Sequence, residues 1–204
     1  MKKLIPNDIL NFIKDLWPMF LLFIIVVCSI RIIDIIMNKK KIVLYQELVN
    51  LVFIIYLLLL FQLVTSTDFE SYSNNFIPFK EIMRYNIDSS LFYKNVIGNI
   101  ILLVPFGYFV SFYLNNLKWY IALILTLITS ISTEIIQMYI GRSFDIDDIL
   151  LNLLGGLIGY LIYKLQYKFI NILPEKIRKN WLADIIAVIV FVIIVSIIYA
   201  ILWR

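Results

Sequence analysis

The chain has 204 residues, 62% of them hydrophobic, and its mean hydropathy is +0.93, whereas a soluble domain is roughly half apolar. It carries a formal net charge of +4, no histidine and a single cysteine, which excludes imidazole bases, histidine-ligated metals and an internal disulfide. Because the basic residues lie beside apolar runs, we expect them to contact anionic lipid rather than nucleic acid.

Five or six apolar runs are long enough to cross a bilayer, which takes about 20 helical residues. In chain order they cover residues 17–37, 42–65, 95–114, 119–139, 149–163 and 182–203. The runs lack the ten-residue alternation of a membrane barrel, so we predict an all-α, polytopic transmembrane helical bundle of about six spans, with five as the alternative. Residues 1–204 form a single membrane domain in this prediction, with N-terminal spans in 1–65, a core in 75–162, and a basic interfacial segment plus the last span in 164–204.

Six spans place both termini on the same side of the membrane as the 66–94 and 140–148 loops. Lysine and arginine are divided almost evenly between the two sides, but the other side holds the denser clusters, at 39–41 and 164–179. Since cytoplasmic loops are enriched in lysine and arginine, we expect those clusters to be cytoplasmic and the termini to face outward.

Polar residues gather where the fourth and fifth predicted spans meet. Glu134 and Gln137 are three residues apart, and Asp148 and Asn152 are four apart, so each pair shares one helix face. The short link between the spans brings the two faces to one membrane depth. Arg142, within that link, is a counter-ion for Glu134 or a neighbouring aspartate.

Two further segments bring polar groups to the same leaflet. Asn95 and Asn99 are four residues apart at the start of the third span, and Asn75 lies in the preceding loop. Pro105 and Gly107 permit a kink within that span. Helix–helix hydrogen bonding and ligand binding are two alternative roles for this asparagine pair.

The two aspartates of the link have three alternative roles. Asp145 or Asp147 could cap the fifth span, and the whole polar cluster could be a network of ion pairs and caps that fixes two helices. Their carboxylate oxygens could instead hold magnesium or calcium, although a D-x-D pattern is a common accident. We therefore expect no cofactor. Gly155, Gly156 and Gly159 have the small-residue spacing that lets another helix approach closely, so we expect a packing role.

Three motifs in order resemble the VanZ-like family. They are N-x-I-P-F from Asn75 to Phe79, N-x-x-G-N-x5-P-F-G from Asn95 to Gly107, and E-x2-Q-x4-R-x2-D-x-D-D-x3-N-x2-G-G-x2-G from Glu134 to Gly159. The resemblance implies a multi-pass protein of the bacterial plasma membrane. The namesake of the family is linked to low-level resistance to the glycopeptide teicoplanin.

The leading functional hypothesis is binding or modification of a cell-envelope lipid or lipid-linked precursor, which lowers glycopeptide susceptibility. Arg142 would contact an anionic group of this ligand. The candidate ligand-binding residues are Asn75, Asn95, Asn99, Glu134, Gln137, Arg142, Asp145, Asp147, Asp148 and Asn152. One alternative is an enzyme that transfers or hydrolyses a lipid headgroup, with Glu134, Asp145 or Asp148 as a catalytic base. A small transporter or flippase is the other, but the charges lie at one leaflet rather than across the bilayer.

Overall fold

The structure, a computed structural model, describes residues 43–65, 74–114, 118–174 and 180–202, together with scattered positions between 21 and 37. The chain divides into two compact units, Met1–Gln62 and Leu63–Arg204. These described residues contain no strand, and their only β-type pairing is one isolated bridge, so the all-α prediction is confirmed.

Helix α2 (Leu44–Thr65) lies mostly in the first unit and corresponds to the second predicted span. Near its start, Glu47 accepts hydrogen bonds from Arg31, at 2.9 Å from Nε and 2.6 Å from Nη2. The described positions around Arg31 are helical, and about half of the first predicted span lies outside the described residues.

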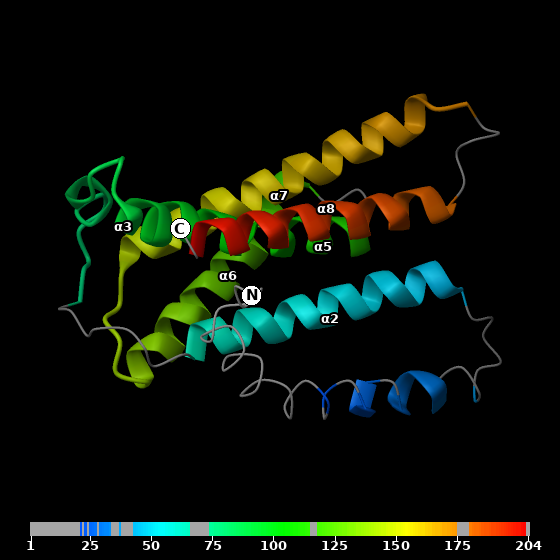
Figure 1. Ribbon diagram of the computed structural model, residues 1–204, viewed down its shortest axis with the longest axis horizontal. Coiled ribbons are helices and arrows are strands. Elements are labelled where there is room, and N and C mark those ends of the chain that lie inside the picture. The colour runs from blue at the N-terminus through cyan, green and yellow to red at the C-terminus, as the bar shows by residue number, and fades with distance from the viewer. Residues whose placement is uncertain are drawn as a thin grey trace, which may run out of the picture. The chain divides into compact units, whose positions relative to one another are not determined.

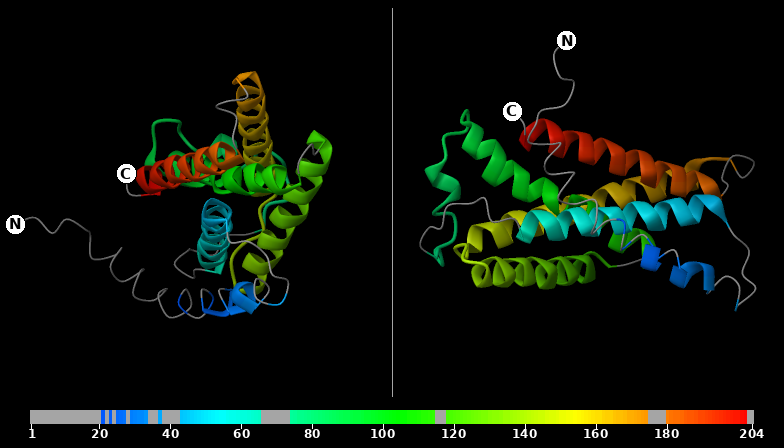
Figure 2. Two further views of the ribbon diagram at one scale, coloured as in Figure 1. Left: turned by 90° about the vertical axis from the view of Figure 1, so that its right-hand side faces the viewer. Right: turned by 60° about the horizontal axis from the view of Figure 1, so that its bottom comes forward.

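The second unit contains the remaining elements. They are η1 (Ile82–Arg84), α3 (Ser90–Phe92), the π-helical turn η2 (Tyr93–Ile97), α4 (Gly98–Leu102), α5 (Val104–Tyr113), α6 (Trp119–Tyr139), α7 (Ile146–Ile172) and α8 (Asn180–Leu202). Helix α7 is central, since it packs against α4, α5 and α6 (Figure 1). Helices α6 and α8 flank the α5–α7 pair on opposite sides (Figure 2).

Four helical segments in the described part of the chain are long and apolar enough to cross a membrane. They are Gln46–Thr65, Ser90–Tyr113, Trp119–Tyr139 and Ile146–Ile172, and they match the second to fifth predicted spans. Helix α8 covers the sixth and contains the apolar stretch Asp184–Ile194. Helix α7 continues past the predicted end of its span at Tyr163, so the first part of the basic segment is helical.

The Ser90–Tyr113 span is interrupted twice. The π-helical turn η2 accommodates an extra residue near its start. A second break lies at Leu103, where φ is −97° and ψ is 5°, and α5 begins directly after it with Pro105 in its first turn. Proline lacks the amide hydrogen that would continue the helical ladder, which accounts for the break beside it.

Glycines allow the backbones of α4, α5 and α7 to approach closely. A Cβ atom added at Gly155 would lie 1.9 Å from the carbonyl oxygen of Ile100, and one at Gly107 would lie 2.1 Å from that of Gly156. Gly159 faces the backbone of α5 in the same way. Any larger side chain would push these helices apart, so the glycines have the predicted packing role.

Candidate functional site

The 74–82 segment docks on the corner between α6 and α7. Asn75 forms the isolated bridge with Asp145, in which the Asn75 amide donates to the Phe144 carbonyl (2.8 Å) and the Ile146 amide donates to the Asn75 carbonyl (3.0 Å). The Asn75 side chain also donates to Asp145 Oδ1 at 2.8 Å. Asn75 is buried, and these contacts identify it as a structural residue that attaches the loop to the helix corner.

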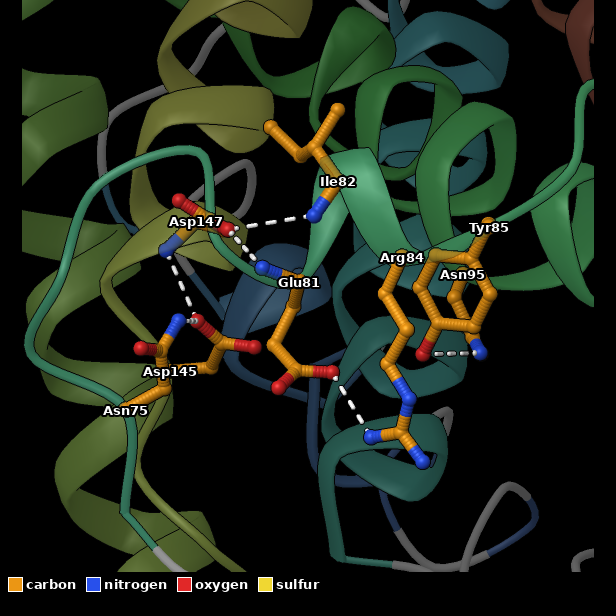
Figure 3. A network of polar contacts seen from close by, with 8 residues as sticks. All are labelled: Asn75, Glu81, Ile82, Arg84, Tyr85, Asn95, Asp145 and Asp147. Carbon is orange, nitrogen blue, oxygen red and sulfur yellow. Dashed lines mark hydrogen bonds and ion pairs between the residues drawn. The ribbon is translucent and has the colours of Figure 1, made fainter.

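Asp147 holds the next part of this segment. Its carboxylate accepts hydrogen bonds from three backbone amides, those of Phe79, Glu81 (2.8 Å) and Ile82 (3.2 Å), as seen in part in Figure 3. Asp145 is the N-cap of α7 and accepts from the Asp147 amide at 2.9 Å, as the capping prediction required. Asp147 is only 1% exposed, so its carboxylate is committed to the fold of the loop.

A chain of hydrogen bonds beside this cap connects the buried Glu134 and Gln137 to the partly exposed Arg142. Glu134 Oε2 accepts from the Asp145 amide at 2.9 Å. With its amide oriented to satisfy both neighbours, Gln137 donates to Glu134 Oε1 (2.8 Å) and accepts from Arg142 Nη1 (2.8 Å). The predicted shared face of Glu134 and Gln137 is therefore present, and Gln137 links the acid to the arginine.

Arg142 also lies close to Asp148. Burial lowers the pKa of the Arg142 guanidinium below its ordinary value, while the Asp148 and Glu134 carboxylates act in the opposite direction. Asp148 Oδ1 accepts a hydrogen bond from Asn99 Nδ2, which ties α4 to α7. Arg142, Asp148 and Asn99 remain partly exposed, whereas Glu134 is 2% exposed.

The pKa of the Asp145 carboxyl is raised above its ordinary value. Burial is the main cause, and the hydrogen bonds from the Asp147 amide and the Asn75 side chain reduce the shift. The carboxylates of Asp147 and Glu81 add to it by repulsion. Burial therefore disfavours the ionised form of the cap, and the surrounding hydrogen-bond donors offset this only in part.

Asn152 lies deeper along α7, on the face it shares with Asp148. Its Nδ2 donates to Ser130 Oγ on α6 at 3.0 Å. Its Oδ1 is buried and is the one side-chain atom among the described buried groups that has no hydrogen-bond partner. An unsatisfied buried acceptor costs about 1–3 kcal/mol.

Asn95 lies apart from Asn99. It is part of the π-helical turn, and its Nδ2 donates to the Tyr85 hydroxyl at 2.9 Å (Figure 3). Burial is the main cause of a raised pKa of Tyr85. The two asparagines thus contact different partners, because the extra residue of the π turn changes the register that a regular helix would have given them.

The structure brings nearly all of the predicted residues to one end of the second unit, with Asn95 at the edge. Two partners were missed by the sequence reasoning: Ser130, four residues before Glu134 on the same helix face, and Tyr85 in the loop. The spacing of Ser130 could have identified it, whereas nothing in the sequence indicated Tyr85. In the described ranges no three acidic or cysteine side chains converge on a possible metal position.

The motif residues fall within a match to a known family. The sequence pattern described as VanZ/LLP1 matches residues 47–173, more than half of the chain. The chain is also 26% identical to "Protein VanZ" of Enterococcus faecium over 138 residues, which cover 67% of this chain and 79% of that protein. No solved structure matches. Since the family match spans the loop, the helix corner and the glycine face, this chain belongs to the VanZ/LLP1 family.

Proposed function

We propose that this protein acts in the bacterial plasma membrane and binds the headgroup of a membrane lipid or lipid-linked envelope precursor, and that it thereby lowers susceptibility to glycopeptides such as teicoplanin. The link to glycopeptides comes from the resemblance to VanZ. The binding role is argued from the polar cluster.

The observation that carries the proposal is the division of that cluster into two layers. Asn75, Asp145 and Asp147 are engaged with the loop and the cap, and they account for the fold of the corner. Arg142 and Asp148 are not needed for the cap, yet they lie at the boundary of two spans and retain partial exposure. Charged groups that the fold of the corner does not need, placed beside apolar spans, favour a functional role.

The chemistry of this second layer suits a headgroup with both acceptors and donors. The Arg142 guanidinium offers paired donors to a phosphate or carboxylate. The partly exposed Asp148 carboxylate accepts hydrogen bonds from hydroxyl or ammonium groups. A phosphorylated sugar or amino-alcohol headgroup has both kinds of group.

Enzymatic transfer or hydrolysis of the headgroup is the second candidate. Both Glu134 oxygens are engaged, one by the Asp145 amide and the other by Gln137. Asp148 is partly exposed, so it is the better candidate for a general base. A purified protein that binds headgroup lipid without altering it would favour simple binding.

The test of binding is mass spectrometry of the lipids that remain with the purified full chain. Wild-type protein is expected to retain a headgroup lipid that Arg142→Gln loses. The matched control is Arg84→Gln, because Arg84 is exposed on the neighbouring loop and pairs at its surface with Glu81 at 3.1 Å. Retention of the same lipids by wild type and by Arg142→Gln would refute the binding role.

A further inference from the structure

The 76–87 loop exposes large apolar side chains at the end of the second unit. Their exposed fractions are 65% for Phe76, 62% for Ile77, 54% for Phe79, 81% for Met83 and 67% for Ile87. The loop lies outside the spans, where such side chains would meet water. A group of apolar residues exposed together marks an interaction surface rather than a solvated turn.

Hydrogen bonds attach the loop at two points to helices that are long and apolar enough to cross a membrane. In the middle of the loop, the amides of Phe79, Glu81 and Ile82 donate to Asp147, which lies in the first turn of the Ile146–Ile172 segment. Near its end, the Tyr85 hydroxyl accepts from Asn95, in the second turn of the Ser90–Tyr113 segment. The loop therefore lies against the first two turns of these helical segments rather than extending away from them.

The backbone of the loop also carries strain. Phe79 has φ of 65°, the left-handed region that is unfavourable for a bulky residue. The bond from the Phe79 amide to Asp147 helps to hold this conformation, and the ring remains exposed. Such strain is maintained only where the surroundings determine it, and it is typical of functional segments.

From these three observations we infer that the 76–87 loop is inserted into the bilayer interface, with its apolar side chains among the lipid acyl chains. Lys80 within this surface is exposed, as is Lys94 in the π-helical turn η2 at the start of the next span. Apolar side chains with flanking lysines are the composition of segments that bind the interface of anionic membranes. The occupant of this surface is thus phospholipid, and the insertion does not depend on the ligand proposed for Arg142.

The experiment measures the depth of the loop with a fluorescent label. The full chain carries Cys28→Ser, which removes its one native cysteine, and a single new cysteine at Met83, Asp88 or Ile124 that is labelled with an environment-sensitive nitrobenzoxadiazole dye. Asp88 is exposed in the segment that follows the loop, and Ile124 is 51% exposed within α6. Each protein is reconstituted into phosphatidylcholine–phosphatidylglycerol vesicles, with and without brominated acyl chains.

Insertion predicts that the Met83 label has blue-shifted emission and is quenched by brominated chains to a degree comparable with the Ile124 label. The Asp88 label is expected to emit as in water and to be quenched weakly. If labelling at Met83 prevents folding, Ile87→Cys replaces it with the same expectation. A Met83 label that emits at the same wavelength as the Asp88 label and is quenched as weakly would overturn the proposal and would indicate that this surface binds a protein partner instead.

Discussion

Replacement of Gly155 by alanine tests the packing that supports the site. The new Cβ would lie 1.9 Å from the carbonyl oxygen of Ile100, whereas ordinary contact begins at 3.4 Å, so the two backbones would have to separate by about 1.5 Å. Overpacking of this kind costs about 1–3 kcal/mol, and the obstacle here is backbone rather than a side chain that can rotate away. We therefore expect the upper end of that range. Ile100 follows Asn99, so the separation would also strain the bond from Asn99 to Asp148.

The assay is thermal unfolding in detergent, followed by circular dichroism. A loss of about 3 kcal/mol corresponds to a decrease in Tm of roughly 6–12 °C for a chain of this size. The matched control is Gly98→Ala, because a Cβ there is 3.6 Å from its nearest neighbour, the Tyr93 carbonyl oxygen. Alanine is the better helix former by about 1 kcal/mol, so the control is expected to keep or raise the Tm. Equal Tm values for the two variants would refute the packing argument.

Three other substitutions test separate parts of the account. Asp147→Ala should cost at least about 2 kcal/mol and speed hydrogen exchange at the three loop amides that it binds; unchanged exchange would contradict the assigned role. Because the pKa of Asp145 is raised in the folded state, the free energy of unfolding of wild type should decrease relative to that of Asp145→Asn as pH increases from the ordinary aspartate pKa of 3.8 through the folded pKa. A constant difference in Tm between the two proteins across a pH series would refute this. Tyr108→Phe removes a buried hydrogen bond to Gln166 and should cost about 1 kcal/mol in the unfolding assay, whereas Tyr139→Phe, at an 83% exposed position, should have no effect.

Helical periodicity accounts for what the sequence alone could predict of the fold and the site. The shared face of Glu134 and Gln137, the cap by Asp145 and the packing role of the glycines all depend on residues a few positions apart, where helix geometry fixes the relation. The boundaries of the apolar runs likewise indicated the spans, apart from the extension of α7 to Ile172 and the earlier starts of the third span at Ser90 and of α7 at Ile146.

Most of the contacts that the sequence did not predict involve irregular backbone. Asp147 binds amides 65 to 68 residues earlier in the chain, and these donors have no side-chain signature. The π turn at Asn95 is similarly invisible, because it depends on one residue accommodated within a continuous helix. Polar residues in this corner were therefore expected as one group, although their partners divide them into a scaffold and a candidate site.

The double variant Glu134→Gln, Arg142→Gln tests most directly whether the cluster is a site or a scaffold. Glutamine at 134 can still accept the hydrogen bond from the Asp145 amide. Because the double variant removes both charges together, neither residue leaves the other's charge without its partner, so thermal stability in detergent should recover relative to the single variants. If Arg142 contacts the ligand, teicoplanin susceptibility should nevertheless stay as high in the double variant as in Arg142→Gln. A double variant that regains both stability and resistance would show that the cluster is structural and would contradict the proposed site.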